Sequence, residues 1–172
     1  PRLAGLKTGS LFSCPYSSQK MIIKEIREFN QKLTQKGIRI IPVRISDKRM
    51  LVYVYRPEKL KEDFSDEKTQ IILKCKGYDC TNLSQCICRL IQKLQSDPDF
   101  PHEIGLFLGY PAEDVKGFIE NKAACSKCSG CWKVYGDEQA ARILFKKYKK
   151  CTEIYCRRWK SGVAVEQLTI TI

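Results

Sequence analysis

Three of the ten cysteines recur at intervals of three residues, as Cys125, Cys128 and Cys131, in a segment that also contains serine and glycine. Two intervening residues let a loop turn successive thiolates toward one ion, and three thiolates supply most of a tetrahedral site. A fourth ligand would complete a zinc site or hold a four-iron cluster. The spacing therefore predicts a zinc or iron–sulfur centre in this loop.

The fourth ligand is sought among the later cysteines, Cys151 and Cys156. They are five residues apart on one predicted helix, and five steps of about 100° place them about 140° apart, so both cannot face one ion. Cys151 falls on the apolar stripe of that helix and is the preferred ligand. Two other interpretations stay open: reversible thiol chemistry between Cys128 and Cys131, or free thiols without chemistry.

The single histidine, His102, precedes with Glu103 an apolar run, 104–108, that is bounded by proline and glycine. Such a run predicts a buried strand, and we expect His102 at or beside a concave site. An imidazole there can act as a general acid/base, a haem ligand or a metal ligand. In an enzyme, His102 and Glu103 would be catalytic beside a cysteine nucleophile, and Gly109 and Tyr110 would bind the cofactor or substrate. The alternative is a hydrogen-bonded structural imidazole.

The charge is strongly positive, with 31 Lys and Arg against 19 Asp and Glu and a formal net charge of +12. Such a surplus favours anionic partners. Much of it follows one face of the last predicted helix, in Arg142, Lys146, Lys149, Lys150, Arg157 and Lys160. This stripe indicates a docking surface for an acidic redox protein of flavodoxin type, and nucleic acid is the alternative, although no aromatic and basic nucleic-acid motif accompanies the charge. The remaining interpretation is a solvated face.

The elements that must position these residues follow from periodicity and end signals. Apolar residues at helical spacing follow Ser17 and Ser18, either of which can cap a helix, and stop before Gly37. They predict a helix between these positions. Residues 38–45 and 50–55 are rich in β-branched and aromatic side chains and lie on either side of the polar segment 46–49. They predict a β-hairpin whose second strand is covered on both faces. The remaining elements are predicted as helices over 57–64, 66–77, 81–96, 111–121 and 138–160, a strand over 132–135 and an extended or looped entry over 1–15.

These elements predict an α+β fold, with a small, mostly antiparallel sheet and an N-terminal hairpin covered by several helices. The length of 172 residues fits a single domain over 1–172, and 43% hydrophobic with 29% charged residues is ordinary globular composition. No apolar run approaches the roughly 20 residues that a membrane span needs. Because several cysteines lie in helical patterns, we expect a cytoplasmic protein without a disulfide framework.

Three segments resemble a bacterial family catalogued as domain of unknown function 3793, which occurs mainly in anaerobic Gram-positive bacteria. They are LAGLKTGSLFSCPY (3–16), PHEIGLFLGYPAEDVKGFIEN (101–121) and CWKVYGDEQAARILFKKYKKCTEIY (131–155). The resemblance implies a bacterial cytosolic protein without an assigned activity. It also implies a Cys-Ser-Pro-Thr start ahead of Leu3, with Arg2 in place of the threonine and the cysteine ahead of Pro1. It fits Cys128 and Cys151 better than Cys125.

The leading hypothesis from the sequence is therefore a cysteine-rich binding protein. It would hold zinc or an iron–sulfur cluster through Cys128, Cys131 and Cys151, with Cys125 assisting, and dock an acidic redox partner on the basic helix. The alternatives are a thiol- or histidine-dependent enzyme acting on a small substrate and a nucleic-acid-binding protein.

Overall fold

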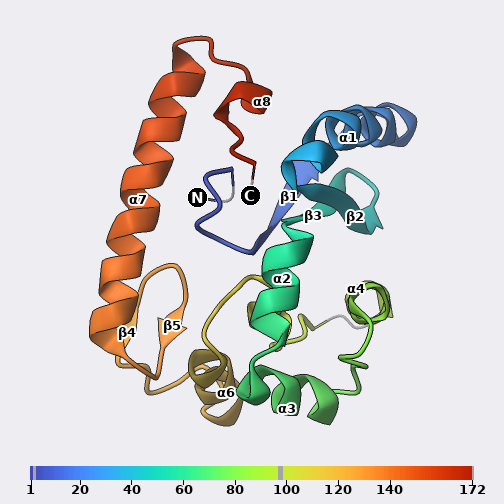
Figure 1. Ribbon diagram of the computed structural model, residues 1–172. Coiled ribbons are helices and arrows are strands. Elements are labelled where there is room, and N and C mark those ends of the chain that lie inside the picture. Colours follow the sequence, from blue (N-terminus) through green and yellow to red (C-terminus); the bar gives the residue numbers. More distant parts are fainter. Residues whose placement is uncertain (2, 97–98, 172) are drawn as a thin grey trace.

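A three-stranded antiparallel sheet forms the centre of the computed structural model, which describes residues 1, 3–96 and 99–171 (Figure 1). Its strands are β1 (Gly9–Pro15), β2 (Arg39–Ser46) and β3 (Arg49–Tyr55), in the order β1-β3-β2. The β2–β3 hairpin is as predicted, and β1 shows that half of the entry segment pairs with the central strand. The α+β class is confirmed.

Both faces of β3 are covered, as its composition predicts. Successive side chains of a strand point to opposite faces, so Met50, Val52 and Val54 pack with Leu33 and Ile38 in one buried cluster. The helix α1 (Gln19–Leu33) covers this face with Ile22, Ile26 and Leu33 of its predicted apolar stripe, whereas Phe29, the fourth member, is exposed. A 3-10 turn, η1 (Thr34–Lys36), and Gly37 in a left-handed conformation then lead the chain into β2.

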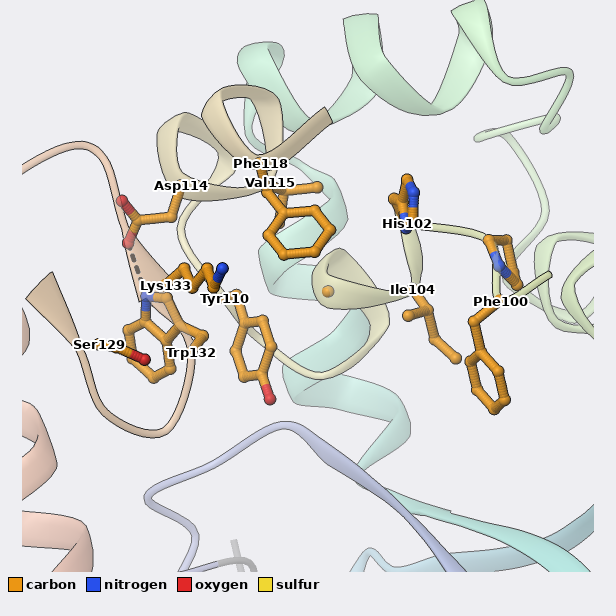
Figure 2. A pocket seen from close by; sticks show the side chains of 12 residues that line it. Phe100, His102, Ile104, Tyr110, Asp114, Val115, Phe118, Ser129, Trp132 and Lys133 are labelled. Carbon is orange, nitrogen blue, oxygen red and sulfur yellow. Dashed lines mark hydrogen bonds between the residues drawn. The ribbon is translucent and has the colours of Figure 1, made fainter. Parts of the chain in front are cut away.

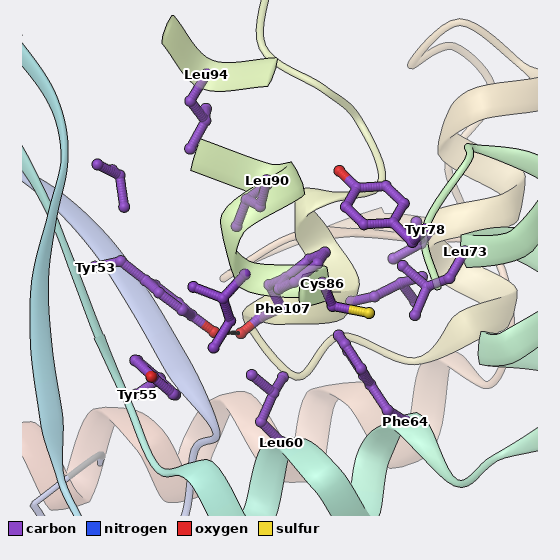
Figure 3. Packing of buried hydrophobic residues seen from close by; sticks show 14 residues of the cluster. Tyr53, Tyr55, Leu60, Phe64, Leu73, Tyr78, Cys86, Leu90, Leu94 and Phe107 are labelled. Atoms are coloured by element: carbon purple, nitrogen blue, oxygen red, sulfur yellow. Dashed lines mark hydrogen bonds between the residues drawn. The ribbon is translucent and has the colours of Figure 1, made fainter. Parts of the chain in front are cut away.

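The opposite face of the sheet carries the main core (Figure 3). Tyr53 and Tyr55 stack at 4.8 Å between ring centroids, and the Tyr53 hydroxyl donates to the carbonyl oxygen of Phe107 at 2.5 Å. The elements that contribute to this core are α2 (Pro57–Phe64), α3 (Glu67–Cys75), α4 (Leu83–Ser96), α5 (Ile104–Phe107) and α6 (Ala112–Glu120). All but α5 occur as predicted from their caps and apolar spacing.

The prediction of a buried strand over 104–108 is wrong, because this segment forms the short helix α5. A buried run of five apolar residues has the same sequence pattern in either structure. Here the backbone bonds are satisfied locally: Leu108 N donates to Ile104 O, and Tyr110 N donates to Gly105 O. Gly109, with φ +74°, then turns the chain away. The burial was predicted correctly for Gly105, Leu106 and Phe107, whereas Ile104 and Leu108 are half-buried.

The last third of the chain forms a separate layer. A two-stranded ribbon of β4 (Cys128–Ser129) and β5 (Lys133–Val134) packs on the first half of α7 (Glu138–Lys160), in a cluster around Trp132, Val134, Ala141 and Tyr148. A short helix, α8 (Val165–Leu168), follows. In Figure 1 α7 stands at one side of the molecule, and both terminal segments run between α7 and the sheet. In the described residues no helix is long and apolar enough to cross a membrane.

Candidate functional site

A cleft of about 360 Å³ lies between the segment that precedes α5, the helix α6 and the β4–β5 hairpin (Figure 2). His102 lines it, as predicted from its position ahead of a buried run. Most of the wall is apolar or aromatic. The lining side chains include Phe100, His102, Tyr110, Phe118, Ser129, Trp132 and Lys133.

Asp114 fixes one wall of the cleft. Its carboxylate is 3% exposed and accepts three hydrogen bonds from the hairpin. Oδ2 accepts from the indole Nε1 of Trp132 at 2.6 Å, and Oδ1 accepts from the backbone N–H groups of Tyr135 and Gly136, each at 2.7 Å. A buried carboxylate that is fully paired in this way holds its partners in one geometry. Asp114 therefore attaches the hairpin to α6.

The indole of Trp132 is held on its other sides by three aromatic rings. Tyr110 stacks on it at 4.7 Å between centroids, and Phe145 and Tyr148 of α7 meet it edge-on at 4.6 and 6.5 Å. The Tyr110 hydroxyl donates to the carbonyl oxygen of Cys131 at 3.3 Å. Burial raises the pKa of Tyr110, with a smaller contribution from Cys131, so the phenol stays neutral. This wall is thus a preformed aromatic surface.

His102 forms the opposite end of the cleft. Its ring meets Phe118 edge-on at 5.1 Å between centroids, and the residue is exposed. Within the part of the chain that the structure describes, no side chain is hydrogen-bonded to the imidazole. The described residues thus position the ring through its aromatic contact with Phe118.

Glu103 has a different role from the one predicted. Its carboxylate is buried, accepts from Lys93 Nζ at 2.6 Å and from the Tyr78 hydroxyl at 3.1 Å, and does not line the cleft. Burial opposes its ionisation, but the bonds from Lys93, the backbone and Tyr78 outweigh burial and lower the pKa of Glu103. Glu103 forms an internal ion pair with Lys93 that joins α4 to α5. No observation therefore supports a catalytic role for Glu103 beside His102.

Of Gly109 and Tyr110, which were predicted to bind a cofactor or substrate, only Tyr110 lines the cleft. A Cβ on Gly109 would lie 2.6 Å from Thr8 Oγ1, and that hydroxyl is hydrogen-bonded to Asp63. Gly109 therefore allows a close approach between the α5–α6 turn and Thr8, the residue that precedes β1. Tyr110 is the member of the pair that contributes to the cleft.

The four cysteines predicted to bind a metal do not come together. Among the described residues no group of three or more His, Cys, Asp or Glu side chains could hold a metal ion. Cys125 is exposed, Cys128 is half-buried against α7, Cys131 is exposed in the hairpin turn and Cys151 is buried on α7. All ten cysteines are free thiols in this structure.

Among the described residues Cys128, Cys131 and Cys151 form no common site, and the length of the hairpin gives a physical reason. The strand expected over 132–135 has only two residues, so the hairpin packs on α7 from Ala141 to Tyr148 and no further. Cys151 is the next inward-facing position along the helix. It lies beyond the hairpin and is buried, as small apolar side chains commonly are.

The structure also contributes residues that the sequence did not single out, above all Asp114 and Trp132. Asp114 lies in the first turn of α6, where the helix dipole alone favours an acidic residue. Phe118 lies four residues later, and positions i and i+4 share one helical face. That spacing, on a helix followed by an aromatic hairpin, was the available signal.

Comparison with known proteins agrees with the resemblance of the three segments. No curated protein and no solved structure matches the chain. A family model described as "Protein of unknown function (DUF3793)" matches residues 1–169. The chain therefore belongs to the DUF3793 family.

Proposed function

We propose that the protein binds a small, planar, anionic molecule in the cleft between His102 and Trp132. The observation that carries the proposal is the lining: Tyr110, Phe118 and Trp132 present aromatic surface around about 360 Å³. Small-molecule sites are typically cavities of this size class, with aromatic walls and a few polar groups. A ring inserted against these walls would gain aromatic contacts of about 0.5–1.5 kcal/mol each beyond area burial.

The polar groups of the cleft indicate which planar molecule it suits. His102 offers ring nitrogens at one end, and Ser129 and Lys133 contribute a hydroxyl and an ammonium at the other. Lys133 Nζ donates to Ala123 O at 2.5 Å, and an ammonium has two further donors. The carboxylate of Asp114, which also lines the cleft, is engaged by three donors of the hairpin. A carboxylate or phenolate on the ring would find donors in Ser129 and Lys133, whereas a cation would be repelled by the Lys133 ammonium.

Binding is supported better than thiol catalysis. A nucleophile and its base must lie within hydrogen-bond reach of each other. In the described chain no cysteine lines this cleft, so His102 has no thiol beside it there.

The test uses naphthalene-2-carboxylate as the probe and Trp132 as the reporter. The chain has two tryptophans, so the Trp159→Phe variant leaves Trp132 as the only indole. We expect saturable quenching of its fluorescence, weakened at least about fivefold by Phe118→Ala and by Lys133→Met. The uncharged naphthalene-2-methanol should bind more weakly.

The matched control is Phe29→Ala, which removes an exposed phenylalanine from α1, away from the cleft. It should leave the affinity unchanged within about twofold. Quenching that is equal in Phe118→Ala and in Phe29→Ala would show that the probe binds elsewhere and would overturn the proposal.

A further inference from the structure

The helix α7 carries a large share of the positive charge and presents it to solvent. It contains eight Lys and Arg residues against two Glu, and all eight basic side chains are exposed. Within the described residues only Arg142 among them forms an ion pair, with Glu138. Of the side chains predicted as a docking surface, Lys146, Lys149, Lys150 and Arg157 are thus exposed without an ion pair among the described residues, whereas Arg142 is paired with Glu138.

Two exposed isoleucines lie among these charges. Ile143 is 57% and Ile154 is 42% exposed, and they are eleven residues, or about three helical turns, apart. From Ile143, successive steps of 4, 3, 4 and 4 residues lead to Lys147, Lys150, Ile154 and Arg158. These residues therefore lie along one face of the helix. We call Ile143, Lys147, Lys150, Ile154 and Arg158 the outer stripe.

The outer stripe is not needed for folding. The face of α7 that packs on the hairpin is defined by Ala141 and Tyr148, and steps of about 100° per residue place the outer stripe roughly opposite that face. A solvated basic helix does not require two large aliphatic side chains on the face that carries its charges. Their position between lysines indicates a surface that another helix covers.

We infer that the outer stripe docks an acidic amphipathic helix of a partner protein. The isoleucines would pack against apolar side chains of the partner, and Lys147, Lys150 and Arg158 would pair with flanking carboxylates, as charged positions beside an apolar seam do in helix pairs. A phosphate backbone would satisfy the lysines but offers the isoleucines no apolar contact. The combination of charge and aliphatic side chains therefore favours a protein helix over nucleic acid. This inference is independent of the ligand cleft.

The test measures the fluorescence anisotropy of a labelled synthetic helix of about 20 residues, long enough to span the stripe. The helix carries Leu at the seam positions and Glu beside them. We expect Lys147→Glu with Lys150→Glu to weaken binding at least tenfold, because like charges then face each other. Ile143→Ser with Ile154→Ser should weaken it at least about fivefold through lost apolar contact.

The matched control is Lys20→Glu with Lys24→Glu, which makes the same charge change at exposed positions of α1. It should alter the affinity by less than about threefold, because exposed charges far from the stripe are screened. All substituted side chains are exposed, and circular dichroism checks that each variant keeps its helix content.

Two outcomes would overturn the inference. One is equal loss of peptide binding in the α1 control, which would mean that only the net charge matters. The other is a 20-base-pair DNA duplex that binds more tightly than the peptide and is unaffected by the serine substitutions, which would assign the surface to nucleic acid.

Discussion

At the scale of single residues, the cysteines act mostly as packing groups and surface thiols. Cys86 is buried in the main core, and its thiol donates to the carbonyl oxygen of Asp79 at 2.8 Å. Cys88, two residues further along α4, is exposed. The helical periodicity predicts this contrast, because positions two apart on a helix point to different faces.

Cys86 should therefore react slowly. Burial raises its pKa to about 11, with smaller contributions from Cys80 and Asp79, and the thiolate is the reactive form. We expect iodoacetamide at pH 8 to modify Cys86 at least about tenfold more slowly than Cys88, by mass spectrometry of peptides from the native protein. Guanidinium should abolish the difference. Equal rates in the native protein would contradict this burial.

The ion pair of Glu103 with Lys93 should contribute pH-dependent stability. The pKa of Glu103 is lower in the folded protein than the roughly 4.3 of an unfolded glutamate. The stabilisation is therefore complete above that unfolded pKa and is lost as pH falls through the folded value. We expect Glu103→Gln to lower the free energy of unfolding at pH 7 by about 2–4 kcal/mol, since it leaves Lys93 unpaired.

Urea denaturation at pH 7 and at pH 3 measures this effect. The loss caused by Glu103→Gln should shrink at the lower pH, because the stabilisation from the wild-type carboxylate declines once pH falls below the unfolded pKa. Glu25→Gln on the exposed face of α1 is the control and should have little effect at either pH. A loss that is the same at both pH values would show that the charge of Glu103 is not the cause.

At the scale of elements, the sequence predicts whatever depends on neighbours in the chain. The caps Asp66 and Asp137 each accept a hydrogen bond from the backbone of the helix that they begin, as their side chains allow. The 104–108 segment could not be assigned in this way. Its conformation depends on a surrounding helical core, with Tyr53 bonded to the carbonyl of Phe107, and periodicity over five residues contains no such information.

Of the cleft, the sequence singled out only His102 and Tyr110. His102 before a buried run indicated a concave site, whereas thiol spacing contains no information about where the hairpin packs on α7. The link that sets this packing is Asp114, which joins α6 to Trp132 and to the backbone of Tyr135. Contacts of this kind, about twenty residues apart, depend on tertiary structure and not on local pattern.

A double substitution tests whether the hydrogen bond from Trp132 to Asp114 stabilises the fold. In Asp114→Asn one oxygen can still accept from Tyr135 and Gly136, but the amide NH₂ then faces the indole N–H, and two donors cannot pair. We expect a loss of about 1–3 kcal/mol in the free energy of unfolding.

Trp132→Phe removes the opposing donor, so the asparagine should cost less in that background than in the wild type. Urea denaturation of the four proteins, followed by circular dichroism, gives the coupling energy. Strictly additive losses would show that the bond from Trp132 to Asp114 does not hold the hairpin.

At the scale of the whole molecule, the layer of α7 and α8 is joined to the sheet through the two ends of the chain. The buried guanidinium of Arg56, at the start of α2, donates to the carbonyl oxygens of Lys36, Leu3 and Ile170 at 2.9, 3.2 and 2.8 Å. Ile170 N in turn donates to Leu3 O at 3.0 Å. One side chain thus links the β1 entry, the turn before β2 and the C-terminal segment.

Arg56→Lys should loosen this link although it keeps the charge. A guanidinium presents five donors in a fixed plane, whereas an ammonium is a compact group that cannot reach three separate carbonyls in the same arrangement. Buried carbonyls would lose their partners, at about 1–3 kcal/mol for each unsatisfied group.

We expect the amide of Ile170 to exchange with solvent at least about tenfold faster in Arg56→Lys, while the amide of Tyr53 in the central strand follows only the change in global stability. Arg27→Lys, at an exposed position of α1, is the matched control and should change neither amide. If Ile170 instead exchanges no faster than Tyr53, the C-terminal segment opens only with the whole fold, and Arg56 stabilises the sheet without holding the two layers together.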